Sequence, residues 1–196
     1  MSTLPIAETT DRDLIRLMVG RVLTDMYPPP KSNPGAVLLE VKDLCIEHTV
    51  CDVNFQVRAG EIVGLAGLGG SGRTTIARAL VGLGDIISGE VRYLGQPVKV
   101  NSSWATRAGV VLIPEDRKSY GLVLDQSIRF NVTLPNLLSL SHWKMVLERF
   151  ERQPVLKAIS DMQVKTPSPE LPAGNLSGGN QQKVVLAKWL MSNPKI

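Results

Sequence analysis

The sequence is poor in the two side chains that build most structural metal sites: it holds two cysteines and two histidines in 196 residues. Cys45 and Cys51 do not have the CxxC spacing of zinc sites, and two cysteines are too few for the disulfide framework of a small secreted domain. These absences argue against a zinc-stabilised module and against a disulfide-rich extracellular fold. We therefore expect both cysteines to be free thiols in a reducing cytoplasm.

The sequence also lacks a long hydrophobic run. No stretch of about 18 or more apolar residues could cross a bilayer, and the first residues do not show the charged, apolar and small-residue regions of an export signal. We expect a chain that neither spans a membrane nor is exported, so that any role at a membrane depends on a partner. The apolar share of 43% suffices for a packed domain, and the net charge of +4 suits phosphate ligands or an anionic surface without requiring either.

The first 35 residues differ in pattern from the rest. Residues 9–22 place apolar side chains at helical spacing behind the candidate caps Thr9, Thr10 and Asp11, which predicts one short amphipathic helix. Residues 27–35 are rich in proline and cannot continue a helix or join the centre of a sheet, which is typical of a linker. Residues 1–35 are therefore expected to form a helix and a linker, and residues 36–196 the domain.

Short apolar runs and helical patterns alternate through the first half of this domain. Helical spacing predicts helices at residues 74–83 and 104–108. The apolar runs predict strands at residues 37–41, 53–57, 61–66, 90–94 and 110–113, the last of them ended by Pro114. Strands that alternate with helices favour an α/β sandwich.

The second half of the domain changes to a helical pattern. Residues 127–163 carry apolar side chains near helical spacing, and Pro154 predicts a break into two helices. Residues 165–175 predict a proline-containing loop, and residues 177–191 a final helix. We interpret the region from about 127 to 192 as a helical subdomain inserted into the α/β fold.

A glycine-rich turn follows the apolar run at 61–66 and leads directly into a predicted helix. It consists of Gly67, Leu68, Gly69, Gly70, Ser71, Gly72, Arg73, Thr74 and Thr75. Backbone amides can converge on a phosphate only where side chains are absent, and the dipole of the following helix attracts an anion further. Two phosphate motifs fit the turn: the GxGxxG of a dinucleotide site, and a P-loop with Arg73 in the place of the usual lysine and Thr74 as the hydroxyl that holds Mg²⁺.

The residues after the next predicted strand distinguish the two motifs. A dinucleotide site needs an acidic residue at the end of that strand to hold the ribose, whereas Gly95 and Gln96 follow the strand at 90–94. The P-loop motif has Thr74 and Thr75 at the required positions and is therefore favoured. A tight structural turn without a ligand is the third interpretation.

A second motif opens the last predicted helix. It consists of Leu176, Ser177, Gly178, Gly179, Asn180 and Gln181. The motif resembles the LSGGQ signature of ABC ATPases in its LSGGNQQK form, and taken alone it is also compatible with an ordinary helix cap by Ser177. With a P-loop upstream and a helical insertion between the two motifs, the chain resembles an ABC cassette over nearly all of residues 36–196.

This resemblance implies a fold and a set of ligands. The expected fold is an α/β P-loop NTPase of the ABC ATPase type, with an antiparallel β subdomain, a helical insertion and an incomplete C-terminal part. The implied ligands are ATP and Mg²⁺, with no nucleic acid. In the family the signature closes over ATP bound to a second cassette, so Ser177 and its neighbours would serve the nucleotide of a partner.

The segment Pro114, Glu115, Asp116, Arg117 resembles the Q-loop region of the sugar-import subfamily, in which PEDR stands where other cassettes have glutamine. The resemblance makes Glu115 a candidate for approaching Mg²⁺ or orienting water, and it implies that the loop lies against the permease. A solvated, charged turn is the alternative interpretation.

A narrower resemblance is to the second cassette of the ATP-binding proteins for ribose, galactose, xylose or arabinose uptake. It is carried by Arg73, by the LSGGNQQK form and by residues 11–30, which are similar to a connector between two cassettes. It implies a fused preceding cassette, transmembrane permease subunits and a periplasmic or lipid-anchored sugar-binding protein as partners. It also implies a peripheral location on the cytoplasmic face of the cell membrane.

The chain departs from the family pattern in three places. Arg73 is a broad fork where lysine is a compact charge. The region that stacks an aromatic ring on adenine in many cassettes offers only Ile46, Glu47 and His48. The sequence stops where the family continues into the Walker B strand, so we expect the chain alone to be inactive in hydrolysis. The resemblance implies an ATP-binding domain that couples ATP binding and hydrolysis to the import of a sugar. A cassette that binds nucleotide without hydrolysing it is the alternative function.

Overall fold

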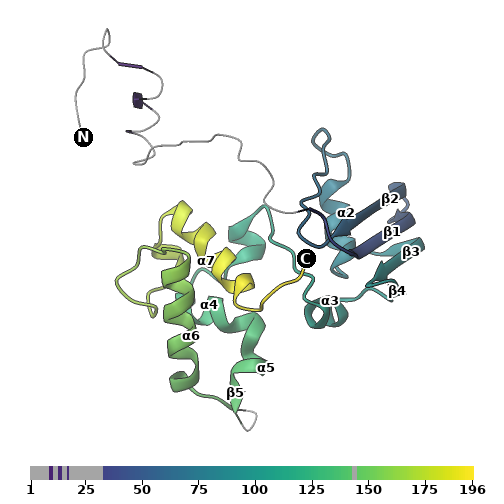
Figure 1. Ribbon diagram of the computed structural model, residues 1–196. Helices are drawn as coiled ribbons and strands as arrows, with labels where there is room; N and C mark the ends of the chain where they lie inside the picture. The colour runs from purple at the N-terminus through teal and green to yellow at the C-terminus, as the bar shows by residue number, and fades with distance from the viewer. Residues whose placement is uncertain (1–8, 11–12, 15–16, 18–32, 143–144) are drawn as a thin grey trace.

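The computed structural model describes residues 9–10, 13–14, 17, 33–142 and 145–196. Most of the predicted helix at 9–22 and of the linker at 27–35 lies outside these residues. Figure 1 shows two lobes: a sheet with the helices α2 and α3, and a second lobe that holds α4 to α7. No helix of the described residues is long and apolar enough to cross a membrane.

The first lobe is built on a four-stranded antiparallel sheet. Its strands are β1 (Val37–Ile46), β2 (Val50–Arg58), β3 (Ile86–Tyr93) and β4 (Gln96–Pro97), in the order β2-β1-β3-β4. One face of β1 is fully buried and packs with Ile76 and Ala79 of α2. The antiparallel β subdomain and the strands predicted at 37–41 and 53–57 are confirmed, and the strand predicted at 90–94 begins earlier, at Ile86.

Two helices of this lobe follow the predicted positions. Helix α2 (Arg73–Leu80) ends earlier than predicted because Gly82 adopts a left-handed conformation with φ of 74°. A side chain at Gly82 would also collide with the backbone of Asn101 and Ser102. Helix α3 (Ser102–Ala108) begins where the side chain of Asn101 accepts a 2.9 Å hydrogen bond from the amide of Trp104.

Two predicted strands are not formed. Residues 61–66 and 110–113 have no regular strand structure, and Ile62 is 98% exposed. A strand requires a ladder of hydrogen bonds to a neighbour, and in the described part of the chain residues 61–66 pair with no other strand. In the second segment, Val110 donates to the carbonyl of Ala105 at 2.9 Å and Val111 to the carbonyl of Ile196 at 3.0 Å, which does not make a strand ladder. These two predictions are therefore wrong for the chain as it stands.

The second lobe is helical, as predicted, and also contains a short hairpin. Its elements are α4 (Ile128–Thr133), η3 (Leu134–Asn136), α5 (Leu137–Leu140), β5 (Ser141–His142), β6 (Met145–Val146), α6 (Glu148–Asp161), η4 (Ala173–Asn175) and α7 (Gly178–Leu190). Pro154 does not divide the helix as predicted, because α6 continues through it. The next residue, Val155, is only 1% exposed in the core of this lobe, and its burial offsets the lost backbone hydrogen bond.

An arginine joins three segments of the helical lobe. Arg129 of α4 donates to Glu151 of α6 at 2.6 Å and to Glu170 at 2.8 and 3.2 Å. The side chain of Glu151 is only 6% exposed. The hydrogen bonds to Glu170, followed by those to Glu151, raise the pKa of Arg129 and keep it charged. The buried Glu151 carboxylate therefore depends on this cation for compensation.

We expect Arg129→Met to lower the free energy of unfolding by about 3 kcal/mol, because it leaves Glu151 buried without a counter-charge. The melting temperature should fall by roughly 6–12 °C. Lys157→Met is the matched control, since it removes a solvent-exposed pair with Asp161 that contributes at most about 0.5 kcal/mol. Equal melting temperatures for the two variants would contradict the role of Arg129.

The two cysteines are not free thiols. Cys45 and Cys51 lie on opposite sides of the turn between β1 and β2, where Ile46 pairs with Val50, and they form a disulfide. The expectation of free thiols is wrong because the hairpin register, which spacing along the sequence does not reveal, brings the two side chains face to face.

Candidate functional site

The glycine-rich turn lies between residues 61–66 and α2, and its backbone leaves the start of α2 open. Gly70 and Gly72 have φ of 80° and 87°, in the left-handed region that favours glycine. Gly72 occupies the N-cap position of α2 and has no side chain to accept from the first-turn amides. Because these amides are uncapped and the turn is largely exposed, they are available to an anion.

A neighbouring side chain of the sheet leaves no room for a side chain at Gly72, the last glycine of the turn. A side chain at Gly72 would collide with Val50, at the start of β2. The turn is thus held against the β1–β2 hairpin. Sequence patterns did not single out Val50, because its place in the hairpin becomes meaningful only when the two segments meet.

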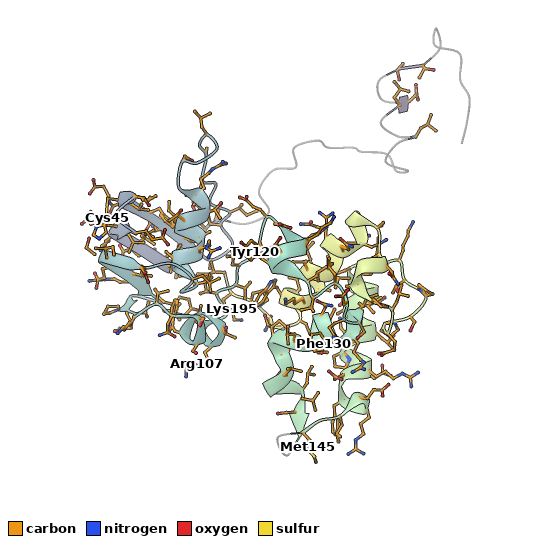
Figure 2. The ribbon with its side chains drawn as sticks, turned by 180° about the vertical axis from the view of Figure 1, so that it is seen from behind. Cys45, Arg107, Tyr120, Phe130, Met145 and Lys195 are labelled. Atoms are coloured by element: carbon orange, nitrogen blue, oxygen red, sulfur yellow. A yellow bond between two sulfur atoms is a disulfide. The ribbon has the colours of Figure 1, made fainter. Side chains whose placement is uncertain are left out.

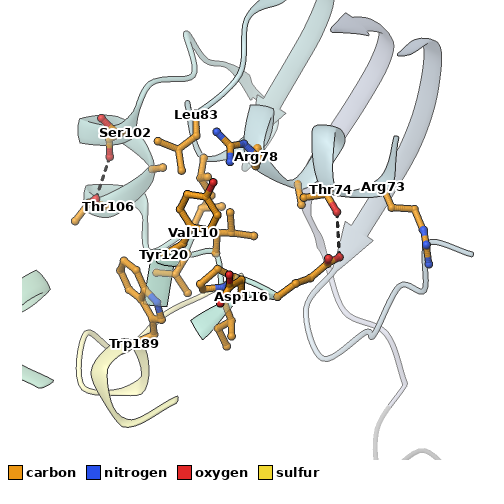
Figure 3. Close-up of a pocket in the computed structure, with 18 of the residues that line it drawn as sticks. Arg73, Thr74, Arg78, Leu83, Ser102, Thr106, Val110, Asp116, Tyr120 and Trp189 are labelled. Carbon is orange, nitrogen blue, oxygen red and sulfur yellow. Dashed lines mark hydrogen bonds between the residues drawn. The ribbon is translucent and has the colours of Figure 1, made fainter. Parts of the chain in front are cut away.

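Two candidate ligand-binding side chains of the turn, those of Thr74 and Arg73, point in different directions. The hydroxyl of Thr74 donates to the Glu115 carboxylate at 3.0 Å (Figure 3). Arg73 also lines the cavity, but its guanidinium group points away from Thr74 and donates to the carbonyl of Leu68 at 3.3 Å. The structure therefore brings together Thr74 and Glu115, the two predicted magnesium ligands, whereas Arg73 folds back onto its own turn.

One hydroxyl and one carboxylate form a small donor set that is compatible with Mg²⁺. This cation is bound in nucleotide sites by one or two protein oxygens, with phosphates and water supplying the rest. Among the described residues no group of three or more His, Cys, Asp or Glu side chains could hold a metal ion. The pair of Thr74 and Glu115 thus fits a cation that arrives with a nucleotide better than a permanent protein-bound metal.

A cavity of about 620 Å³ opens beside Thr74, between the two lobes. Its wall includes α2, α3, residues 110–116 and Trp189 of α7, and it is mainly apolar (Figure 3). Tyr120, which is 72% exposed, lies at the junction of the lobes (Figure 2). Neither Trp189 nor Tyr120 was a predicted site residue, and no sequence pattern marked them.

The residue after Glu115 has a structural task. The Asp116 carboxylate accepts from the amides of Lys118 at 2.8 Å and Ser119 at 3.2 Å, and from the Ser119 hydroxyl at 2.6 Å. These hydrogen bonds, the Ser119 hydroxyl first, lower the pKa of Asp116. Asp116 thereby caps a single π-helical turn, η2 (Arg117–Gly121). Both oxygens of Asp116 accept hydrogen bonds within this cap. Glu115 is therefore the carboxylate of the pair that contacts the glycine-rich turn, through Thr74.

The signature-like motif starts α7 with an exposed end. Ser177, Gly178 and Gly179 are exposed, and a side chain at Gly179 would meet only open space. Ser177 occupies the N-cap position, but its side chain does not cap the helix. The Ser177 hydroxyl instead accepts from the Asn180 side chain at 3.0 Å. The interpretation of Ser177 as an ordinary side-chain cap is therefore wrong, and the first-turn amides of α7 are uncapped.

The sixth residue of this motif faces inward. Gln181 is 5% exposed, and its amide nitrogen donates to the carbonyl of Leu176 at 3.1 Å and to those of Ala173 and Gly174 at 3.4 Å. Its amide oxygen accepts from Arg117 at 3.1 Å. The side chain of Gln181 is consequently satisfied within its own chain, and the residues of the motif that are exposed to solvent are 177–179.

The region proposed for adenine offers little contact surface. Ile46 is fully buried in the core of the sheet lobe, whereas Glu47 and His48 form the exposed hairpin turn, with φ of 51° and 54°. Of these three residues, His48 alone has an aromatic ring, and its imidazole is exposed.

Comparisons with known proteins agree with the two motifs. A family model described as ABC transporter matches residues 50–196. The ribose import ATP-binding protein of Bacillus licheniformis is 44% identical over 197 residues, which cover 100% of this chain and 40% of that protein. A putative ribose/galactose/methyl galactoside import ATP-binding protein of Rhizobium etli is 42% identical, covering 98% of this chain and 37% of that protein. The chain thus spans about 40% of the length of these relatives.

Solved structures support the fold. A nucleotide-free ATP-binding cassette from an ABC transporter superposes with a TM-score of 0.64 at 17% identity, covering 81% of this chain and 66% of that one. A bacterial Atm1-family ABC exporter with ATP bound gives a TM-score of 0.63 at 21% identity, covering 93% of this chain and 32% of that one.

Proposed function

The chain belongs to the ABC transporter family, and from this premise we propose that it is an ATP-binding cassette that couples ATP binding and hydrolysis to the import of a sugar. The observation that carries the proposal is the contact between Thr74 and Glu115 beside an uncapped helix start. The family assignment excludes the dinucleotide interpretation of the glycine-rich turn. The similarity to ribose import proteins supports a monosaccharide as the cargo.

In this proposal residues 67–75 bind the phosphates of ATP. The uncapped amides at the start of α2 and the dipole of the helix favour an anion there, and glycines allow the backbone to approach it closely. Thr74 and Glu115 hold Mg²⁺, which neutralises charge on the phosphates. Arg73 strengthens the turn through the carbonyl of Leu68 and contributes long-range positive charge.

The proposed role of residues 176–181 is to close over the nucleotide of a second cassette. The exposed, uncapped start of α7 supports this role, because its amides are available to an anion that approaches from outside the chain. The implied partners are a second cassette, fused before residues 1–35, transmembrane permease subunits and a sugar-binding protein. The protein would then work as a peripheral component on the cytoplasmic face of the membrane.

A cassette that binds nucleotide without hydrolysing it is the second candidate function. Two observations favour it: the guanidinium group of Arg73 is bonded to its own turn at Leu68, and Asp116 caps η2, so that of these two acidic neighbours Glu115 alone contacts the glycine-rich turn. Either candidate requires Mg²⁺-ATP to bind at residues 67–75, so a binding experiment tests both.

We expect Thr74→Ala to weaken the binding of Mg²⁺-ATP by roughly tenfold. This corresponds to about 1.4 kcal/mol, the contribution of one charge-assisted contact. Binding of ATP in the presence of a chelator should change by less than twofold, because the hydroxyl acts through the cation. Thr166→Ala is the control, since its hydroxyl donates to the Ser168 carbonyl at 2.8 Å in a loop of the helical lobe, away from the cavity. Isothermal titration with both nucleotide forms measures the effect. An equal loss with and without Mg²⁺ would contradict the assignment of Thr74.

A further inference from the structure

A disulfide closes the end of the β1–β2 hairpin. Cys45, the last residue but one of β1, is bonded to Cys51, the second residue of β2. Cys45 is half-buried, whereas Cys51 is exposed to solvent. Figure 2 places Cys45 at the edge of the sheet lobe that faces away from the helical lobe. The bond can therefore be reached by small thiols from the solution.

The pairing of the two strands is irregular around the disulfide. The register of β1 and β2 shifts on both sides of Leu44, between Val41 and Leu44 and again between Leu44 and Ile46. Two residues near the cysteines, Asp43 and Asp52, have φ of 48° and 56°, in the left-handed region that non-glycine residues rarely adopt. The regular ladder of hydrogen bonds is interrupted here, so the disulfide links the strands where the ladder is weakest.

The start of β2 has fewer neighbours than the end of β1. In the sheet order β2-β1-β3-β4, β2 is an edge strand, which pairs with β1 alone in the described part of the chain. Ile46, at the end of β1, is fully buried and pairs with Ile86 of β3 as well as with Val50 of β2. Opening the disulfide would therefore release the start of β2 and leave the end of β1 in place.

The residue that starts β2 supports the glycine-rich turn. Val50 packs against the core of the sheet lobe and also lies so close to Gly72 that a Cβ atom there would collide with it. Gly72 is the N-cap of α2, and its φ of 87° sets the direction of the uncapped amides that follow. Because Cys51 is the next residue after Val50, the disulfide restrains the side chain that supports the phosphate-binding turn.

We propose that the Cys45–Cys51 disulfide is a redox switch for nucleotide binding at residues 67–75. The inference rests on the proposed nucleotide site. The closed disulfide holds Val50 against Gly72, so that the turn presents its amides to the phosphates. Reduction releases the start of β2, withdraws this support and lowers the affinity for Mg²⁺-ATP. At the proposed cytoplasmic location thiols keep most disulfides reduced, and those that form there are usually catalytic or redox-sensing.

The switch works by thiol–disulfide exchange with glutathione. A glutathione thiolate attacks Sγ of Cys51, the exposed sulfur, and the electron pair of the broken S–S bond passes to Sγ of Cys45, which takes up a proton. A second glutathione thiolate attacks the mixed disulfide, and Cys51 leaves as a thiol. Two electrons and two protons thus pass from two glutathione molecules to the cysteine pair, and oxidised glutathione is formed. Oxidised glutathione drives the reverse reaction.

Titration of the 196-residue chain with Mg²⁺-ATP in oxidised and in reduced glutathione tests this proposal. Alkylation of free thiols, followed by a mass measurement, reports whether the disulfide is closed or open in each medium. We expect the dissociation constant to be roughly fivefold higher in the reduced chain, because affinity falls with the fraction of molecules that keep the binding-competent turn. Without nucleotide, hydrogen exchange at amides 70–75 should become faster on reduction, whereas exchange in β3 should stay the same.

Three variants locate the switch. Cys45→Ser combined with Cys51→Ser should bind Mg²⁺-ATP equally in both media, with the affinity of the reduced chain. Val50→Ala keeps both cysteines and removes the side chain that supplies the three atoms nearest to Gly72, so it should also lose the difference between the media. Val53→Ala is the matched control, because Val53 lies on the same strand and packs against the same core. It should keep the difference.

Each outcome decides the proposal. Equal affinity in both media, with the cysteines bonded in one and free in the other, would overturn the switch. A disulfide that does not close in oxidised glutathione, a double variant that still responds, or a full response in Val50→Ala would overturn it as well. Faster exchange throughout β3 on reduction would show a general loss of the sheet and would also count against it. Failure to bind Mg²⁺-ATP in either medium would instead contradict the proposed nucleotide site, and the inference with it.

Discussion

ATP hydrolysis by the 196-residue chain is expected to remain at the rate measured without protein. Phosphoryl transfer in P-loop ATPases uses groups that hold Mg²⁺ and groups that orient the attacking water, and this electrostatic positioning supplies most of the rate. The described residues direct one carboxylate, Glu115, at the phosphate-binding turn, while the oxygens of Asp116 cap η2. One carboxylate cannot perform both tasks.

The decisive comparison is with a version of the chain extended through the Walker B strand into which sequences of the family continue. We expect the rate of phosphate release to rise roughly a thousandfold or more on extension, because positioned groups that stabilise charge in the transition state change rates on this scale. Thr74→Ala in the extended chain should remove this gain. If the unextended chain hydrolysed ATP and Thr74→Ala abolished that activity, Glu115 would suffice as the carboxylate for hydrolysis, and the prediction would be wrong.

The same pair of proteins distinguishes the two candidate functions through Arg73. If the cassette hydrolyses ATP, the extended chain is active with Arg73 in place. If it only binds nucleotide, the extended chain becomes active only as Arg73→Lys, because lysine supplies a compact charge that can reach the phosphates. Arg73→Lys without the extension should leave the chain inactive under both functions, which makes it the control.

Ser177→Arg is expected to abolish ATP-dependent closure between cassettes in a two-cassette protein that contains this chain. The substitution places a long side chain over the exposed first turn of α7, where residues 177–179 would meet the partner's nucleotide. We expect closure, measured by cross-linking or by fluorescence transfer between the cassettes, to fall at least tenfold, while binding at residues 67–75 of the same chain changes by less than twofold.

The control for this experiment is Ser160→Arg, the same replacement on the exposed surface of α6. It adds the same charge and length without covering the start of α7, so closure should be retained. Normal closure and transport in Ser177→Arg would contradict the role assigned to the signature-like motif. A loss of binding at residues 67–75 would show that the motif acts within its own chain.

Local features of the molecule could be predicted because they depend on neighbours in the sequence. The glycine-rich turn was predicted to present backbone amides at the start of a helix, and the last helix was predicted to begin at the signature-like motif, as α2 and α7 do. The hairpin strands β1 and β2 were predicted because apolar alternation depends on a short stretch of chain. The family followed from the same two glycine motifs, and its model matches residues 50–196.

The errors concern features that depend on how elements pair and pack. Residues 61–66 have the composition of a buried strand, but a strand exists only where another segment completes its ladder of hydrogen bonds. Pro154 has the local character of a helix breaker, but the packing of Val155 outweighs it. The register of the hairpin decided the pairing of Cys45 and Cys51.

The sequence by itself determined the two motifs, the elements that carry them and the family to which the chain belongs. Tertiary structure alone decided which side chains meet: Thr74 with Glu115, 41 positions apart, and Arg117 with Gln181, 64 positions apart. The reason is physical. Helix starts and turns are set by torsion angles and hydrogen bonds within a few residues, whereas contacts over such separations form only after the lobes pack and the chain entropy of bringing the segments together has been overcome.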